Sequence, residues 1–243
     1  MSGHSKWHNI RLKKAKTDAA KSGVTSKCLR DVMLASRAGG GSPDTNFKLK
    51  IAVERARNAN VSMDSITRAI KRGIGEGEGG PMEELTYEAY GPGGAAILVQ
   101  AATDNRNRTA SEVRFIFSKH GGRLAELGSV SWMFEQKGLI ELDKEGMSED
   151  DALSYAIDAG ADDMKAEDEV YEIYTAPADL EVVRNNLEAA GVKVTSSDLT
   201  MVPKSMVTLD AEDVEKLIRL LDALEEQDDV SQVHTNFEGP PEG

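Results

Sequence analysis

Apolar residues at helical spacing, interleaved with lysine and arginine, fill the first third of the chain. Three amphipathic helices are predicted from apolar stripes at Leu29–Val32–Met33, Phe47–Ile51–Ala52–Ala56 and Met63–Ile66–Ile70. The first helix spans residues 26–38 and ends at three glycines, while Asp44 or Thr45 caps the second and Ser62 the third. The residues before these helices are too polar and basic to form a core, and we expect a mobile arm there.

A glycine-rich stretch, GIGEGEGGP at residues 73–81, separates this region from the rest. It matches G-x-G-x-x-G formally, but a dinucleotide-binding fingerprint should follow a strand and open a helix. Here the stretch follows a helix, contains two glutamates and leads into Pro81. We therefore interpret it as a linker.

Strands and helices alternate after the linker. ELTYEAY, GPGG and AAILVQA predict strand, turn and strand, and Thr109 with Glu112 predicts a capping box before a helix that ends at Gly121. Further strands are predicted near Val130–Phe134, Leu139–Leu142, Asp162–Ala166, Val170–Tyr174, Val192–Val202 and Val230–Phe237. Further helices are predicted after Ser148, Pro177 and Asp210.

The order of elements in residues 130–203 is that of a ferredoxin-like unit. The flanking pieces, 82–128 and 205–238, could together form a second unit of the same kind. The predicted fold class is α+β, with an N-terminal helical domain and two ferredoxin-like α/β domains, one inserted in the other. The predicted domains are residues 1–80, residues 81–129 with 204–243, and residues 130–203.

Charge is segregated along the chain, which the net charge of −13 conceals. Residues 1–73 hold 16 Lys+Arg and 5 Asp+Glu, a net of +11, so residues 74–243 carry a net of −24. A basic segment attracts polyanions and an acidic one repels them. The alternative is that both groups of charges only aid solubility. Solubility alone does not require positive and negative residues to lie in separate segments.

The composition and the motifs that are missing exclude several classes of protein. One cysteine, Cys28, excludes an internal disulfide and fits the reducing cytoplasm, and we expect it to be buried and inert. The basic N-terminus lacks the apolar stretch of a signal peptide, and no segment is apolar enough to span a membrane. The motifs G-x-x-x-x-G-K-[ST], H-E-x-x-H, G-x-S-x-G and C-x-x-C are missing, so no enzyme, metal or cofactor is predicted.

Five segments closely resemble the YebC/PmpR family: GHSKWHNIRLKKAKTDAAK, AGGGSPDTNFKLKIAVERARNANV, ITRAIKRGIG, YEAYGPGGAAILV and TDNRNRTASEVR. The resemblance covers essentially the whole chain, and it implies a helical domain and two α/β domains, one inserted in the other. It also implies a regulator of gene expression. Members of this family are described as DNA-binding transcriptional regulators, and others act in translation, including on ribosomes stalled at proline-rich sequences.

Basic residues in three groups are the candidate nucleic-acid contacts. The arm contributes phosphate-neutralising cations and Trp7, which could stack on a base; the alternative is a solvated tail. The helices contribute arginines suited to phosphate, the alternative being an ordinary solvated surface. Arg106 and Arg108 precede a helix N-terminus that suits an anion, or else they are structural arginines of a capped loop. The predicted site comprises His4, Lys6, Trp7, Arg11, Lys13, Lys14, Lys16, Lys21, Arg30, Arg37, Arg55, Arg57, Arg68, Lys71, Arg72, Arg106 and Arg108.

The sequence therefore predicts a monomeric, cytoplasmic, non-enzymatic regulator that binds DNA or rRNA, with the ribosome as a partner and no small-molecule substrate. The acidic runs Ser148–Asp151, Asp162–Glu169 and Glu225–Asp229 are interpreted as solvated faces. They could instead contact a basic protein, which would make the chain a protein–protein adaptor. An enzyme with an unrecognised site is a third hypothesis.

Overall fold

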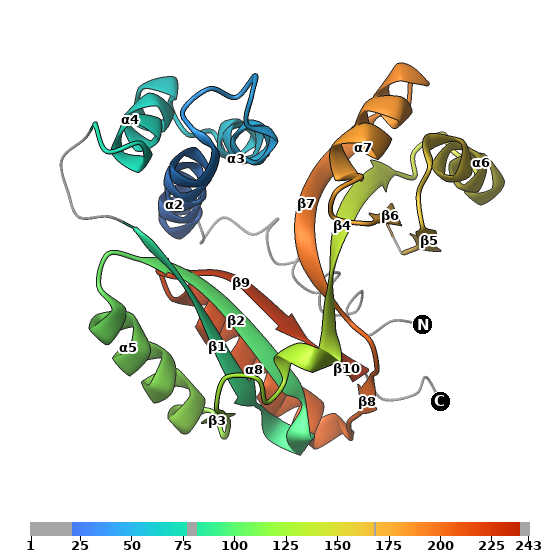
Figure 1. Ribbon diagram of the computed structural model, residues 1–243. Helices are drawn as coiled ribbons and strands as arrows, with labels where there is room; N and C mark the ends of the chain where they lie inside the picture. The colour runs from blue at the N-terminus through green and yellow to red at the C-terminus, as the bar shows by residue number, and fades with distance from the viewer. Residues whose placement is uncertain (1–20, 77–81, 168, 239–243) are drawn as a thin grey trace. The chain divides into compact units, whose positions relative to one another are not determined.

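The computed structural model describes residues 21–76, 82–167 and 169–238 (Figure 1). The chain divides into two compact units, Met1–Met133 with Pro203–Gly243, and Phe134–Val202. The elements of the first unit are α2 (Lys21–Gly39), α3 (Phe47–Asn58), α4 (Met63–Gly73), β1 (Glu83–Tyr90), β2 (Ala96–Thr103), α5 (Arg106–Lys119), β3 (Arg123–Leu124), β8 (Val207–Thr208), α8 (Ala211–Glu226), β9 (Val230–Thr235) and β10 (Phe237–Glu238). The finer division into three domains stays a prediction.

The three predicted N-terminal helices are present as α2, α3 and α4. Ser62 caps α4 as predicted, since its side chain accepts a hydrogen bond from the Ser65 N–H. The predicted cap of α3 was wrong, because Asn46 and not Asp44 or Thr45 caps it. The buried Asn46 amide also donates to the carbonyls of Ala35 and Gly40, so one side chain ends α2 and starts α3. Asn is a preferred N-cap residue, and its bond to the Leu49 N–H is the ordinary local cap, so the same side chain meets the local preference and also joins the two helices.

Helices α2 and α4 approach each other closely where α4 ends. A Cβ placed on Gly73 would lie 1.9 Å from Ser36 Oγ and 2.4 Å from the Met33 carbonyl oxygen. Around this contact Val32, Leu49 and Ile66 are fully buried. Each such aliphatic side chain contributes roughly 1.5–3 kcal/mol on burial. The same core includes Ala102 of β2, so the helices pack onto the sheet of this unit.

The sheet of the first unit has the strand order β3-β1-β2-β9, with antiparallel pairing throughout. Helices α5 and α8 cover one face, where Phe117 of α5 and Leu217 and Leu221 of α8 pack against Ile97 and Val99 of β2. The predicted final strand is interrupted at Asn236, whose side chain accepts a hydrogen bond from the Ala96 N–H. Beyond it, β10 pairs in parallel with β8.

Helix α5 begins earlier than predicted. Asn105 caps it by accepting a hydrogen bond from the Arg108 N–H, whereas Thr109 lies inside the helix, so the capping box predicted with Glu112 was wrong. Arg106 and Arg108 therefore belong to the first turn of α5 and do not precede it. The Thr109 hydroxyl donates a hydrogen bond to the side chain of Asp229, which is distant in the sequence. The pattern around Thr109 therefore indicated the wrong start for α5.

The second unit contains β4 (Phe134–Asp143), α6 (Glu149–Ala159), β5 (Asp163–Ala166), β6 (Val170–Thr175), α7 (Leu180–Ala189) and β7 (Val194–Pro203). Its strand order, β5-β6-β4-β7, is ferredoxin-like. The strand predicted at 130–134 was wrong, because Ser131–Met133 form a 3₁₀ turn and β4 begins only at Phe134, whereas the strand predicted at 139–142 lies within β4. Ser148 and Gly160 begin and end α6 as predicted.

These elements confirm the α+β fold class, with a helical part and two four-stranded α/β sheets, one unit inserted between β3 and β8 of the other. The two four-stranded sheets differ in how their strands follow one another along the chain. The central strands β1 and β2 of the first sheet are consecutive, whereas β4 and β6 are separated by α6 and β5.

A G73A substitution should lower the free energy of unfolding by about 1–3 kcal/mol, because the added methyl group overlaps the backbone of α2. The matched control is G23A in α2, where nothing lies within 4 Å of the added Cβ. It should raise stability by up to about 1 kcal/mol through helix propensity alone. Urea unfolding followed by circular dichroism measures both, and equal effects would contradict the close helix contact.

Candidate nucleic-acid interface

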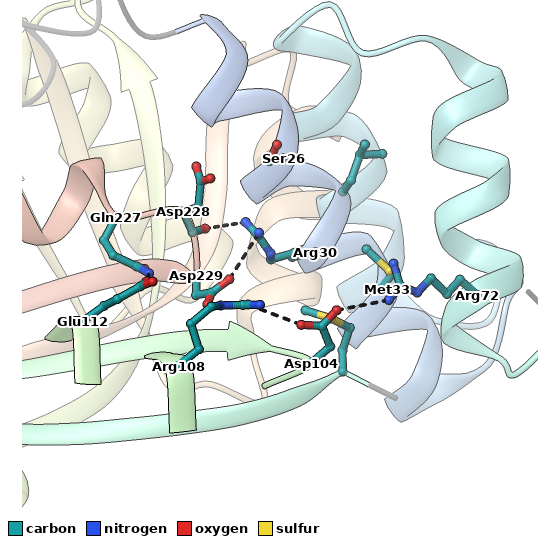
Figure 2. Close-up of a pocket in the computed structure, with 12 residues that line it drawn as sticks. Ser26, Arg30, Met33, Arg72, Asp104, Arg108, Glu112, Gln227, Asp228 and Asp229 are labelled. Atoms are coloured by element: carbon teal, nitrogen blue, oxygen red, sulfur yellow. Dashed lines mark hydrogen bonds and ion pairs between the residues drawn. The ribbon is translucent and has the colours of Figure 1, made fainter. Parts of the chain in front are cut away.

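Three of the arginines predicted to contact nucleic acid come together in the first unit. Arg30 of α2, Arg72 of α4 and Arg108 of α5 line a cavity of about 540 Å³ (Figure 2). Asp104, Glu112, Asp228 and Asp229 line it as well. The cavity thus places the predicted phosphate-binding cations beside carboxylates of the same chain.

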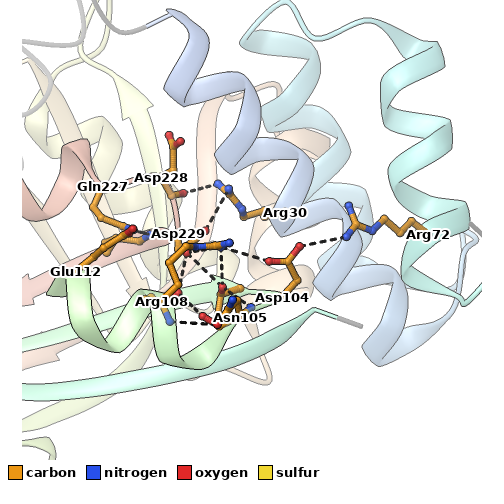
Figure 3. A network of polar contacts seen from close by, with 12 residues as sticks. Arg30, Arg72, Asp104, Asn105, Arg108, Glu112, Gln227, Asp228 and Asp229 are labelled. Atoms are coloured by element: carbon orange, nitrogen blue, oxygen red, sulfur yellow. Dashed lines mark hydrogen bonds and ion pairs between the residues drawn. The ribbon is translucent and has the colours of Figure 1, made fainter. Parts of the chain in front are cut away.

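Asp229 is the centre of this arrangement (Figure 3). Its side chain is 3% exposed and accepts hydrogen bonds from Thr109 Oγ1 at 2.7 Å, Arg108 at 2.9 Å and Thr103 Oγ1 at 3.2 Å. Arg30 forms an ion pair with its other oxygen at 3.2 Å. The Asp229 main-chain carbonyl accepts from the Ala102 N–H. A buried carboxylate needs this many partners, because an unpaired buried charge is strongly destabilising.

The Asp229 network lowers the pKa of its own carboxyl group. Burial acts in the opposite direction and by itself would raise that pKa. The hydrogen bonds from Thr109 and Arg108 and the charge of Arg30 outweigh burial, so the pKa of Asp229 lies below its ordinary value. Asp229 is therefore ionised at neutral pH.

Helix α2 also docks on the C-terminal end of α8. Lys27 donates a hydrogen bond to the Glu225 carbonyl and Arg30 donates to the Asp228 carbonyl. The Glu225 carbonyl belongs to the last turn of α8, where carbonyls lack partners within the helix and carry partial negative charge, which favours a cation such as Lys27. Burial lowers the pKa of Lys27. These contacts fix α2 to the α/β part of the unit.

Other predicted arginines also have partners within the protein. Arg55 pairs with Asp31 at 3.3 Å and Arg72 with Asp104 at 3.6 Å, while Arg37 donates to the Met82 carbonyl. Arg106 lies 3.6 Å from Glu83, with both side chains largely exposed, and such a pair contributes little. Asp104 and Asp229, which pair with Arg72, Arg30 and Arg108, come from outside the helical region.

A second set of predicted cations is exposed on α3 and α4. Arg57, Arg68 and Lys71 form no ion pair among the residues that the structure describes, and the Arg68 guanidinium donates a hydrogen bond to the Ser65 hydroxyl. These three are available to an outside anion. The arm residues His4, Lys6, Trp7, Arg11, Lys13, Lys14 and Lys16, and the side chain of Lys21, lie outside the described part.

Sequence reasoning missed Asp229, which it assigned to a solvated acidic run, although this residue is buried. The signal that could have found it is the cluster Thr103, Asn105, Arg108 and Thr109, whose polar side chains exceed what one helix cap uses. Cys28 is buried as predicted, and burial raises the pKa of its thiol. Within residues 21–76, 82–167 and 169–238, no cluster of possible metal ligands occurs and no helix could cross a membrane.

Two family models match the chain. The model of the TACO1/YebC protein N-terminal domain matches residues 5–76, and the model of the TACO1/YebC second and third domain matches residues 82–237. The gap between the matches falls on the predicted linker.

Relatives match over nearly the full length. A "Probable transcriptional regulatory protein" of Pelotomaculum thermopropionicum is 51% identical over 98% of this chain and 99% of its own. A protein of the same name from Dictyoglomus turgidum is 47% identical over 100% of this chain and 98% of its own. The crystal structure of the conserved hypothetical protein Aq1575 from Aquifex aeolicus superposes with a TM-score of 0.88 and covers 94% of each chain, and the two sequences are 48% identical.

A D229N substitution should lower the free energy of unfolding at pH 7 by about 2–3 kcal/mol, since it leaves Arg30 and Arg108 without their shared anion while both keep some contact with water. The depressed pKa of Asp229 contributes stability that is present above its ordinary value of 3.8 and is lost as the pH falls through the folded-state value. Part of the acid destabilisation should therefore disappear in D229N.

The neighbouring D228N is the matched control, because Asp228 is exposed and contacts Arg30 through its main-chain carbonyl. It should change stability by less than about 0.5 kcal/mol. Urea unfolding of the wild type and both variants at pH 7 and at pH 3 measures the difference. If D229N and D228N behave alike, Asp229 does not hold α2 in place.

Proposed function

The chain belongs to the TACO1/YebC family, and from this premise we propose that it is a non-enzymatic regulator of gene expression that binds nucleic acid through its basic N-terminal region. The segregation of charge carries the proposal, because residues 1–73 have a net charge of +11 in a chain of −13. Neutralising phosphates with lysine and arginine releases counterions and drives binding to any polynucleotide. The relatives named as probable transcriptional regulatory proteins support the regulatory role.

The cations that perform the binding are those not used inside the protein. Arg57, Arg68 and Lys71 on α3 and α4 supply exposed charges, and the arm supplies Lys6, Arg11, Lys13, Lys14 and Lys16. Arg30, Arg55, Arg72 and Arg108 instead hold the helices together and against the α/β part. They act on binding by placing the exposed cations.

The contacts are of the phosphate type, which position a protein but carry little sequence information. This character favours structured rRNA on the ribosome, and hence a role in translation, over a unique DNA operator. A role in transcription through DNA is the alternative that the names of the relatives support. We propose that the protein acts as a monomer in the cytoplasm, without a cofactor, and that its acidic inserted unit, residues 134–202, stays away from the polyanion.

The inserted unit supports a second candidate function, that of a protein–protein adaptor. Residues 134–202 hold 18 Asp+Glu and 5 Lys+Arg, a net of −13. Ile157 on α6 and Val182 on α7 are more than half exposed. An acidic surface with exposed apolar residues suits a basic protein partner.

Changing Lys13, Lys14 and Lys16 together to alanine should flatten the dependence of log affinity on log salt concentration by roughly two to three units. The control changes three exposed lysines of the α/β parts, Lys193, Lys204 and Lys216, and should leave the slope unaltered. Fluorescence anisotropy with a labelled duplex over a series of salt concentrations measures both. An unchanged slope in the arm variant would remove the arm from the mechanism.

Crosslinking in cells, followed by sequencing of the bound nucleic acid, should recover reads concentrated in 23S rRNA, because phosphate contacts suit structured RNA. Reads concentrated in promoter DNA would assign the protein to transcription instead. Recovery of protein partners that persist after nuclease treatment, with no enriched nucleic acid, would favour the adaptor and contradict nucleic-acid binding.

A further inference from the structure

The outer face of α5 is cationic although it lies in the acidic remainder of the chain. Residues 103–123 hold 5 Lys+Arg and 2 Asp+Glu, whereas the rest of residues 74–243 holds 8 and 35. On α5, Val113 and Phe117 face the core, which leaves Arg114, Phe115 and Lys119 on the exposed side. The face therefore differs in charge from its surroundings in the sequence.

Within the described residues, the cations on this face are not used in ion pairs. Arg114 and Lys119 have no ion-pair partner in the part of the chain that the structure describes. The exposed cations of α8 provide the contrast, since Lys216 pairs with Glu212 and Arg219 with Glu215 at i,i+4 spacing. Charges that the protein leaves unpaired on one face favour a polyanionic partner.

Phe115 adds an aromatic surface next to Lys119. Its side chain is 65% exposed, and Lys119 Nζ lies 5.9 Å from the centre of its ring. A second pair of the same kind follows where β3 packs near the end of α5. There Arg123 lies 5.4 Å from the ring of Tyr90, its partner across the strands. An aromatic ring with a cation beside it offers stacking to a base and neutralisation to the adjoining phosphate.

We propose that the outer face of α5 is a second nucleic-acid contact that takes single-stranded polynucleotide, with an unpaired base stacked on Phe115 and adjacent phosphates on Arg114 and Lys119. The inference rests on the proposed function and adds to it a preference for unpaired nucleotides. A duplex can place phosphates on Arg114 and Lys119, but it cannot stack a base on Phe115, because its bases are already stacked on each other. The contact is independent of sequence, since every base has a face that can stack.

The test measures affinity of the full chain for a single-stranded RNA of about twelve nucleotides and for the same RNA annealed to its complement. F115A and F115L should bind the single strand about tenfold more weakly and the duplex normally, whereas F115Y should bind both as the wild type does. I157A removes a comparably exposed apolar side chain from the acidic α6 and should change neither affinity.

Charge is tested in the same assay. R114Q/K119Q should lower the salt slope for the single strand by roughly 1.4 units, and K216Q/R219Q on α8 should leave it unchanged. Normal single-strand binding by F115A would overturn the inference while leaving the proposed function intact. Normal binding by F115L would also overturn it, because an aliphatic residue cannot supply aromatic stacking. Failure of the wild type to bind any polynucleotide would overturn the proposed function and this inference with it.

Discussion

The buried carboxylate of Asp229 is the interaction on which the first unit depends. It lies between α8 and β9, and it draws together Arg30 from α2, Arg108 and Thr109 from α5 and Thr103 from the end of β2. A carboxylate that is 3% exposed is tolerated only because these donors replace its water. The same donors need it, since removing the anion leaves two guanidinium groups facing each other. Mutual dependence of this kind gives one fixed placement of α2 on the α/β part.

That placement also sorts the basic residues into two classes. Arginines facing Asp229, Asp104 and Asp31 are neutralised within the protein and hold helices in position. Arg57, Arg68 and Lys71 on α3 and α4, and Arg114 and Lys119 on α5, point to solvent without a carboxylate partner among the described residues. A count of positive charge treats both classes alike, although only the second can exchange counterions for phosphate. Positioning and binding are thus separate tasks for chemically identical side chains.

Much of the fold could be predicted from local signals. Ser62, Ser148 and Asp210 cap helices where predicted, because each side chain reaches an N–H three residues further along. The failures have different causes. Asn46 follows Asp44 and Thr45, and all three are N-cap residue types, so the local signal did not single out Asn46. The Thr109 hydroxyl instead donates to Asp229, outside α5, so the pattern around it indicated the wrong helix start. The strand predicted at Val130–Phe134 was wrong, because the N–H groups of Val130 and Ser131 donate to the Glu88 carboxylate and the chain forms a 3₁₀ turn before β4 begins at Phe134.

The sequence by itself determined the element types, the α+β class, the family resemblance and the separation of positive from negative charge, since these depend on residue identity and short-range spacing. Only the tertiary structure decided which arginines are free. Arg30 is bound to a residue 198 positions away, and Arg108 to one 121 positions away. No periodicity connects residues at such separations, because chain reversals at several turns and the insertion of a whole unit bring them together. The burial of Asp229 and the exposure of Phe115 follow from that assembly, and neither could be predicted from the residues beside them.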